Sequence, residues 1–224
     1  MEKPVGARRI YLDFNASTPI APEVADAMRG VLSEPFGNPS SEHWAGEPAK
    51  HVIEKARAHV AVLLGCKPNE IVFTSGGSEA NNHALKGVFF AKGQAKAHFI
   101  TTEVEHPAVI NPCRFLERLG ATATYLPVDG FGRVDPDDVR RAITPETILI
   151  SVMHANNEVG TIQPIPEIAR IAREHGILFH TDAAQSLGKV ATRTDELGVD
   201  LLSVAGHKLY GLKGVGVFFV SEHV

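Results

Sequence analysis

Residues 147–181, TILISVMHANNEVGTIQPIPEIARIAREHGILFHT, decide the fold class of this protein. The runs 147–153 and 177–181 are short and apolar, which is typical of buried strands. Between them, residues 164–176 carry isoleucine and alanine at helical spacing. Two apolar strands joined by a helix predict a parallel pair with a crossover connection.

The same alternation continues on both sides of this unit. Upstream, the pattern predicts in turn helix 47–65 ending at Gly65, strand 71–74, helix 76–90, strand 97–102, helix 107–120, strand 121–127 and helix 135–143. Downstream, the apolar runs 199–205 and 214–220 are separated by only eight residues, too few for a crossover helix. The sequence therefore predicts an α/β fold: a mainly parallel sheet with an antiparallel edge strand and helices on both faces.

The composition excludes several classes of protein. The 224 residues carry 22 lysines and arginines against 26 aspartates and glutamates, and a net charge of −4 indicates no nucleic-acid and no membrane-surface partner. The apolar runs are far shorter than the ~20 residues of a membrane span, and the N-terminus has no signal core. Two cysteines without a CxxC pair and 11 histidines without HExxH predict neither a disulfide framework nor a metal site. We expect a cytoplasmic protein.

Residues capable of chemistry follow five of the predicted strands. The segments are SGGSE (75–79), EVEHP (103–107), HANNE (154–158), TDAAQ (181–185) and AGHK (205–208). In open α/β sheets, ligands bind outside the carboxyl ends of the strands. We therefore expect the five segments to converge on one active site.

Two of these segments allow a functional and an ordinary interpretation. Residues 75–78, Ser-Gly-Gly-Ser, could bring backbone N–H groups at a helix start close to a phosphate, or could form an ordinary glycine turn. No nucleotide-binding lysine or GxGxxG pattern accompanies them. Lys208, in a glycine-rich loop, is either solvent-exposed or a Schiff-base lysine, which needs its pKa lowered from ~10.4 towards neutrality.

Two further residues each allow two interpretations from the sequence alone. Asp182 ends a predicted strand, and it could cap a helix or hold a pyridine nitrogen protonated. His106 precedes Pro107 at a helix start, where it could be a surface residue or a neutral imidazole that moves protons.

Taken together, these residues resemble the cysteine desulfurases of the class V aminotransferase group, which are pyridoxal-phosphate enzymes of fold type I. The matching strings are YLDFNASTP (11–19), FGNPSSEHWAG (36–46), FTSGGSEANN (73–82), TTEVEHPAV (101–109), MHANNEVGTIQPI (153–165), HTDAAQSLGK (180–189) and GHKLYG (206–211). The resemblance runs from about residue 10 to the end of the chain. It implies that residues 21–224 form the large domain that binds pyridoxal 5′-phosphate, preceded by an N-terminal segment, 1–20.

The resemblance also implies roles for individual residues. Lys208 is similar to the catalytic lysine that forms the internal aldimine, His106 to the catalytic histidine stacked on the cofactor ring, and Asp182 to the partner of the pyridine nitrogen. The remaining implied cofactor contacts are Asn157 and Gln185 at the phenolic oxygen, and Gly77, Ser78 and His207 at the phosphate.

The implied reaction converts L-cysteine to L-alanine and leaves the sulfur as a persulfide on an enzyme cysteine. The family implies a homodimer, a possible sulfur-acceptor protein and a link to iron–sulfur cluster assembly. Alternatives are a selenocysteine lyase acting on L-selenocysteine, another class V aminotransferase, and a non-catalytic fragment that binds the cofactor or a partner.

Three departures from the family pattern bear on this expectation. Ala205 stands where desulfurases usually carry a phosphate-binding serine, and Leu212 replaces the usual proline. The chain is also much shorter than family members, so we expect it to lack the C-terminal small domain with its catalytic-cysteine loop and substrate-binding arginine. Cys66 and Cys113 are predicted to pack as small hydrophobic residues. Arg8 or Arg9 is the remaining candidate for binding the substrate carboxylate.

Overall fold

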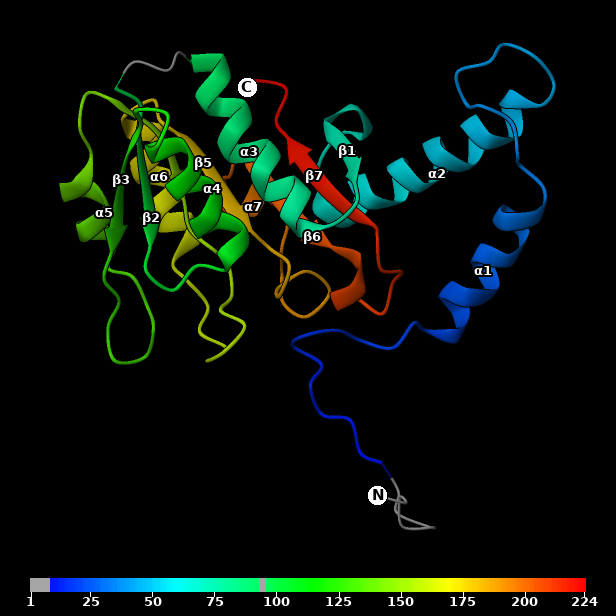
Figure 1. Cartoon of the computed structure of the whole chain (residues 1–224), viewed down its shortest axis with the longest axis horizontal. Helices are drawn as coiled ribbons and strands as arrows, with labels where there is room; N and C mark the ends of the chain where they lie inside the picture. The colour runs from blue at the N-terminus through cyan, green and yellow to red at the C-terminus, as the bar shows by residue number, and fades with distance from the viewer. Residues whose placement is uncertain (1–8, 93–95) are drawn as a thin grey trace.

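A computed structural model describes residues 9–92 and 96–224 (Figure 1). The helices are α1 (Pro22–Ser33), α2 (Gly46–Leu64), α3 (Gly77–Lys92), α4 (Pro107–Glu117), α5 (Pro136–Ala142), α6 (Ile165–Glu174) and α7 (Thr194–Leu197), with 3₁₀ turns η1 (Pro68–Glu70) and η2 (Gly206–Lys208). The strands are β1 (Ile71–Thr74), β2 (His98–Thr102), β3 (Thr122–Leu126), β4 (Thr147–Ser151), β5 (Leu178–Asp182), β6 (Leu201–Ala205) and β7 (Gly216–Val220).

Within the described residues, seven strands form one sheet in the order β1-β7-β6-β5-β4-β2-β3. The neighbours from β6 to β3 pair in parallel, whereas β7 runs antiparallel to both β6 and β1. The predicted fold class is confirmed, including the antiparallel pairing of the last two strands. The outermost strand at that end is β1, because it pairs along the free side of β7.

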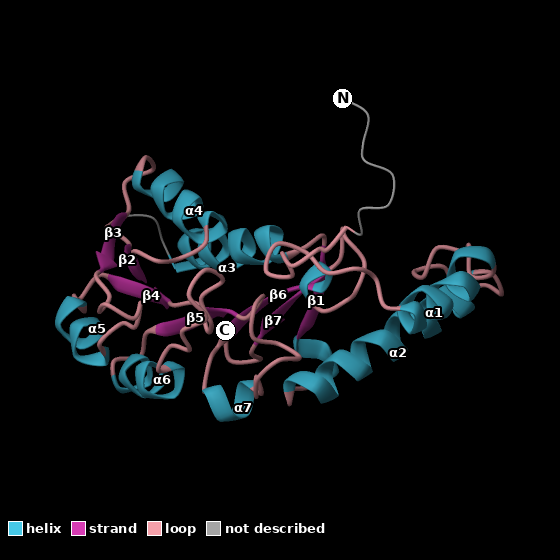
Figure 2. Cartoon of the chain, turned by 90° about the horizontal axis from the view of Figure 1, so that it is seen from below, coloured by secondary structure: helices cyan, strands magenta, loops and turns pink. Residues whose placement is uncertain are grey.

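Helices cover both faces of the sheet, as predicted (Figure 2). On one face, α3 and α4 pack with β-strand residues in a core that includes Leu85, Phe89 and Leu116. On the other face, α2, α5, α6 and α7 contribute to a second core, centred on residues such as Ile150 and Ile168. The parallel strands β2, β4, β5 and β6 are buried along nearly their whole length because both faces are covered.

The helix boundaries follow local chemistry. Helix α2 ends where Gly65 adopts a left-handed backbone conformation with φ 70°, as its C-cap position requires. Helix α4 starts at Pro107 and ends at Glu117, three residues before the predicted end, and Gly120 turns the chain with φ 97°.

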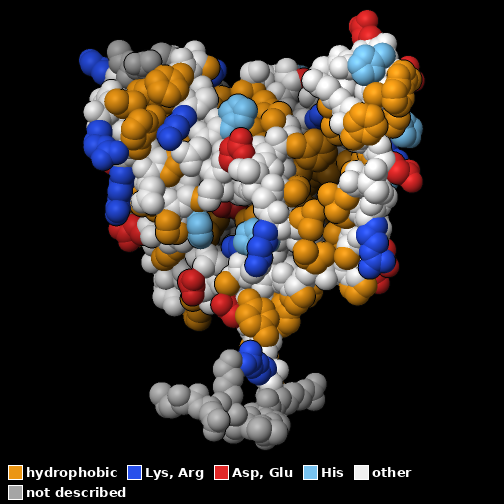
Figure 3. Space-filling model, turned by 45° about the vertical axis from the view of Figure 1, so that its right-hand side comes forward, with side chains coloured by type: hydrophobic (Ala, Val, Ile, Leu, Met, Phe, Trp, Pro, Cys, Tyr) orange, Lys and Arg blue, Asp and Glu red, His pale blue; other side chains and the backbone are white. Residues whose placement is uncertain are grey.

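One part of the chain projects from this sheet. Helix α1, which the strand–helix alternation did not predict, buries no residue, and it lies beside the outer end of α2 (Figures 1 and 2). Figure 3 shows hydrophobic side chains spread over the face on which these helices lie. No helix in the part of the chain that the structure describes is both long and apolar enough to cross a bilayer.

Candidate active site

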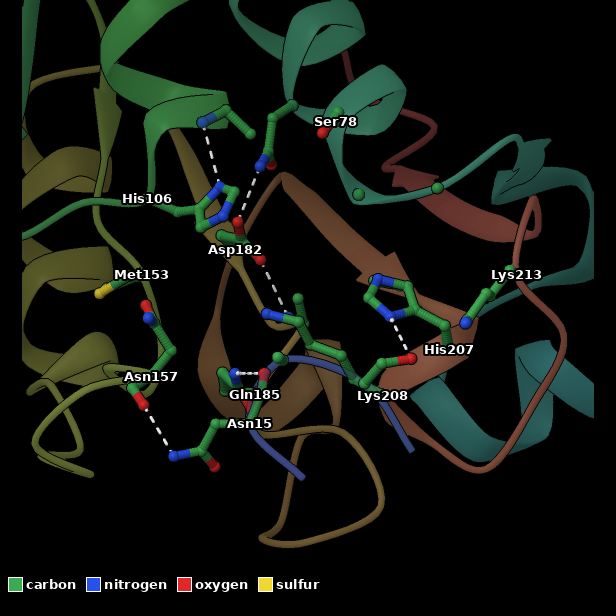
Figure 4. A pocket seen from close by; sticks show the side chains of 18 of the residues that line it. Asn15, Ser78, His106, Met153, Asn157, Asp182, Gln185, His207, Lys208 and Lys213 are labelled. Atoms are coloured by element: carbon green, nitrogen blue, oxygen red, sulfur yellow. Dashed lines mark hydrogen bonds between the residues drawn. The ribbon is translucent and has the colours of Figure 1, made fainter. Parts of the chain in front are cut away.

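A cavity of about 910 Å³ opens at the carboxyl ends of β5 and β6, beside the N-terminus of α3 (Figure 4). All five segments that follow predicted strands contribute to its lining. The cavity is lined by every site residue singled out from the sequence: Gly77, Ser78, His106, Asn157, Asp182, Gln185, His207 and Lys208. They meet because a parallel sheet brings the carboxyl ends of its strands to one edge.

Lys208 stands in the turn η2, immediately after β6, and its side chain is half-buried. Desolvation lowers the pKa of Lys208 from its ordinary value, and the nearby charge of Lys189 acts in the same direction, against the opposing influence of Asp182. A lysine with a lowered pKa is more often present as the free amine, which is the nucleophilic form.

The loop that carries Lys208 is held by the N-terminal segment. Thr18 donates its hydroxyl hydrogen to the carbonyl oxygen of His207 at 2.9 Å and accepts the backbone N–H of Tyr210 at 2.8 Å. Desolvation, followed by the charges of Lys208 and Lys213, lowers the pKa of His207. Burial, the largest cause, and the two nearby cations together disfavour the imidazolium form at this position.

Asp182 lies at the end of β5 and is buried beneath the cavity. One carboxylate oxygen, Oδ1, accepts the backbone N–H of Ala184 at 2.9 Å, and the other, Oδ2, accepts the amide N–H of Asn81 at 2.7 Å. Two N–H donors suit an ionised carboxylate, which is an acceptor at both oxygens.

His106 is the N-cap residue of α4, where its ring nitrogen Nδ1 accepts the backbone N–H of Ala108 at 3.1 Å. A ring nitrogen that accepts a hydrogen bond carries no proton, so Nε2 is the donor of the neutral ring. Figure 4 shows His106 beside Asp182 at the edge of the same space.

The two amides predicted to contact a bound ring have other partners in this structure. Gln185 donates from Nε2 to the carbonyl oxygen of Asn15 at 2.8 Å and accepts the Lys189 ammonium at 2.9 Å. Asn157 donates from Nδ2 to the carboxylate of Glu158 at 2.6 Å, and its backbone carbonyl oxygen accepts from the Asn15 side-chain amide at 3.0 Å.

The N-terminus of α3 forms the other end of the cavity. Gly76 passes close to the first residue of β7, Gly216: a Cβ built on Gly216 would lie 2.5 Å from the Gly76 Cα, so glycine at 216 is required for this approach. Gly77 faces Ala205, whose Cβ lies 3.4 Å from the position that a Cβ on Gly77 would take. The first N–H groups of a helix, with Lys213 also lining the cavity, suit an anionic group such as phosphate.

These features together fit pyridoxal 5′-phosphate. The cavity has a volume within the usual range for ligand pockets, ~300–1,000 Å³. It combines a lysine with lowered pKa, a buried carboxylate and a helix N-terminus. Among the residues that the structure describes, no group of three or more His, Cys, Asp or Glu side chains could hold a metal ion.

Neither cysteine lines the cavity. Cys113 is buried in α4, and burial raises the pKa of its thiol to about 12. Cys66 follows α2, is partly buried against the core, and has a pKa raised to about 11, mainly by desolvation. Arg9 is exposed and does not line the cavity, whereas Arg8 lies outside the described residues.

Two buried titratable groups lie below the lining residues. His180 is fully buried between the hydroxyls of Ser151, 2.8 Å from Nδ1, and Ser203, 2.9 Å from Nε2, and desolvation lowers its pKa to about 4. Glu105 accepts hydrogen bonds from Thr102 and from the backbone N–H of Met153, and desolvation raises its pKa to about 8.

Sequence reasoning missed several lining residues, among them Asn15, Ser17, Asn81 and Lys213. Asn15 and Ser17 belong to the string YLDFNASTP, which carried part of the family resemblance and was the available signal. Asn81 belongs to the string FTSGGSEANN (73–82), which also carried part of the resemblance, but no spacing rule connects it to Asp182.

Comparisons with known proteins bear on the family of this chain. The family model described as Aminotransferase class-V matches residues 10–224. A cysteine desulfurase IscS of Dictyoglomus turgidum is 55% identical over 215 residues, 96% of this chain and 55% of that protein. A mitosomal cysteine desulfurase of Encephalitozoon cuniculi is 48% identical over 218 residues, 96% of this chain and 50% of that protein.

Solved structures give the same result. The structure titled SspA in complex with cysteine has a TM-score of 0.91 and 46% identity, covering 94% of this chain and 60% of that one. A NifS-like protein has a TM-score of 0.94 and 39% identity, and the match covers 97% of this chain and 60% of that one. The chain spans about half the length of the curated relatives that it matches.

Proposed function

Because the chain belongs to the class V aminotransferase family, we propose that it is the cofactor-binding part of a pyridoxal-5′-phosphate-dependent cysteine desulfurase. The proposed reaction converts L-cysteine to L-alanine and transfers the sulfur to a thiol. The observation that carries the proposal is one cavity that holds both Lys208, with its lowered pKa, and the buried carboxylate of Asp182.

When bound, pyridoxal 5′-phosphate supplies an electron sink for the substrate's reacting carbon. We assign covalent attachment of the cofactor to Lys208 Nζ, and the contact with its ring nitrogen to Asp182. The other proposed contacts are Gly77, Ser78 and His207 with the phosphate, His106 with the ring face, and Asn157 and Gln185 with the ring oxygen. The domain assignment, 21–224 after an N-terminal segment 1–20, is part of the same proposal.

The chain's own groups can also move protons. The lowered pKa of Lys208 makes its amine available as a base, and the neutral His106 ring has Nε2 as a donor. These two groups lie in the same cavity, where a bound amino acid would react.

The sulfur-accepting step requires a thiolate that reaches the substrate. Burial raises the pKa of both thiols in this chain and neither lines the cavity, so we assign that role to neither Cys66 nor Cys113. A homodimer, a sulfur-acceptor protein and a cytoplasmic site of action belong to the proposal as well. The structural neighbour whose title names a complex with cysteine supports L-cysteine as the substrate.

A second candidate is selenocysteine lyase. The observation that favours it is the apolar Ala205 in the cavity lining, since the resemblance implies a serine there in cysteine desulfurases and an apolar residue as compatible with the lyase.

The test is the position of the covalent bond. The chain is mixed with pyridoxal 5′-phosphate, reduced with borohydride and digested, and peptide masses are measured. We expect the pyridoxyl group on Lys208 and none in Lys208→Ala. Lys189 and Lys213, the nearby lysines, are the internal controls, and a label on either in the wild type would contradict the assignment.

A further inference from the structure

Among the residues that the structure describes, Asn81 is the one polar side chain of helix α3 that bonds to the buried carboxylate of the site. It lies in the second turn of α3 and is fully buried. Its amide Nδ2 donates to Asp182 Oδ2 at 2.7 Å, across a separation of 101 residues in the chain.

The other polar atom of the Asn81 side chain has no partner in the described part of the chain. Its carbonyl oxygen, Oδ1, is buried and accepts no hydrogen bond from any residue in 9–92 or 96–224. A buried acceptor without a donor costs stability, whereas a leucine of similar shape would be buried without that cost. The role of an asparagine at this position therefore rests on its hydrogen bond to Asp182.

That bond completes the support of the carboxylate. The backbone N–H of Ala184 holds Oδ1, and the Asn81 amide holds Oδ2, so the plane of the carboxylate is set by two donors from different elements. Below the carboxylate, the His180 ring bonds to two hydroxyls and has a lowered pKa, so it supplies no positive charge next to Asp182. The negative charge of Asp182 can therefore interact with a group bound in the cavity.

Helix α3 also forms the anion-binding end of the same cavity. Gly77 and Ser78 stand in its first turn, and Asn81 follows Gly77 by four residues, on the same side of the helix. One rigid helix therefore sets the position of the phosphate-binding groups relative to the carboxylate.

We propose that Asn81 is a positioning residue, which orients the Asp182 carboxylate towards the ring nitrogen of bound pyridoxal 5′-phosphate and thereby tunes the electronic state of the ring. This rests on the proposed function. Asn81 acts through Asp182, and the loss of its N–H leaves the carboxylate held by Ala184 alone.

The test compares Asn81→Leu with the matched control Asn82→Leu. Asn82 is the next residue, does not line the cavity, and donates its amide to the carbonyl oxygen of Ser78 within the helix. Binding of pyridoxal 5′-phosphate is titrated, and the pH dependence of the bound chromophore's absorption is recorded. We expect Asn81→Leu to weaken binding at least about tenfold and to shift the absorption titration, since bonds to charged groups are among the strongest. Asn82→Leu should change neither.

Two further measurements separate positioning from a merely structural role. The melting temperature without cofactor should fall little in Asn81→Leu, because the unpaired acceptor Oδ1 is removed along with the donor and because water in the cavity that Asp182 lines can replace the lost N–H. In an Asp182→Asn background, Asn81→Leu should have little further effect on binding, as expected for residues that act as a pair. Asn81→Ala provides a second variant should leucine prevent folding.

The outcomes are distinguishable. Unchanged affinity and an unchanged absorption titration in Asn81→Leu or Asn81→Ala would overturn the role of Asn81, as would fully additive effects with Asp182→Asn. If the wild-type chain itself bound no pyridoxal 5′-phosphate, the proposed function would fail, and the assignment of Asn81 with it.

Discussion

Substituting Ala205 by serine should tighten the binding of pyridoxal 5′-phosphate. Ala205 ends β6, is buried and lines the cavity opposite Gly77, the first residue of α3. Because Gly77 has no Cβ, a hydroxyl on residue 205 has room to turn towards the N-terminus of α3, where we place the phosphate. The serine already present nearby, Ser203, cannot serve instead, since it is fully buried and bonded to His180.

The magnitude follows from the charge of the acceptor. A hydrogen bond to a charged group contributes about 1.5–3 kcal/mol, or roughly 10- to 150-fold in the dissociation constant. Fixing the serine rotamer offsets part of this gain. We therefore expect a value near the lower limit, about tenfold tighter binding.

The assay is a titration of the chain with pyridoxal 5′-phosphate, followed by absorption, for the wild type and Ala205→Ser. Ala108→Ser is the control, since Ala108 lines the same cavity beside His106 rather than at the α3 end. Unchanged or weaker binding by Ala205→Ser would refute the reasoning and would mean that backbone N–H groups already satisfy the phosphate at this position.

Three other predictions concern groups outside the cavity. The 224-residue chain should release no alanine and sulfide from L-cysteine, because burial raises the pKa of Cys66 to about 11 and of Cys113 to about 12; turnover that disappears in Cys66→Ser or Cys113→Ser would overturn this. The pKa of His180 falls from 6.5 to about 4 on folding, so the free energy of unfolding should decrease as the pH falls through that interval. The decrease should be smaller in His180→Gln. An equal dependence of the unfolding free energy on pH in both proteins, measured by urea unfolding, would count against it. The pKa of Glu105 rises from 4.5 to about 8 on folding, so the contribution of this carboxyl group to stability is complete below pH 4.5 and is lost as the pH rises through 8. The variant Glu105→Gln keeps an acceptor for the Met153 N–H and should lose less stability over that interval. Urea unfolding midpoints measured across the interval would show the difference.

Local patterns predicted most of the elements of this fold. The strand 71–74 was predicted at its observed bounds, and helix 47–65 was predicted to end at Gly65, which adopts the left-handed conformation of a C-cap. The eight-residue connection between 199–205 and 214–220 was enough to predict an antiparallel pair. Periodicity, turn residues and connection lengths are properties of neighbouring residues, and they act in the same way wherever the segment lies.

The convergence of the five segments was also predictable, because strand direction alone brings their ends to one edge. The finer arrangement was not. Helix α1 projects without buried residues, and β1 pairs with β7 from the other end of the chain. The partners of the site residues come from equally distant segments: Asn81 bonds to Asp182, and Thr18 holds the loop of Lys208.

The sequence by itself therefore determined the α/β alternation, the family and the five strand-end segments that meet at one cavity. The tertiary structure decided which donor meets which acceptor, which thiols are buried, and which carboxyls and imidazoles have shifted pKa values. The physical reason is that periodicity and turn chemistry are encoded locally, whereas desolvation and hydrogen-bond geometry arise between segments that packing brings together.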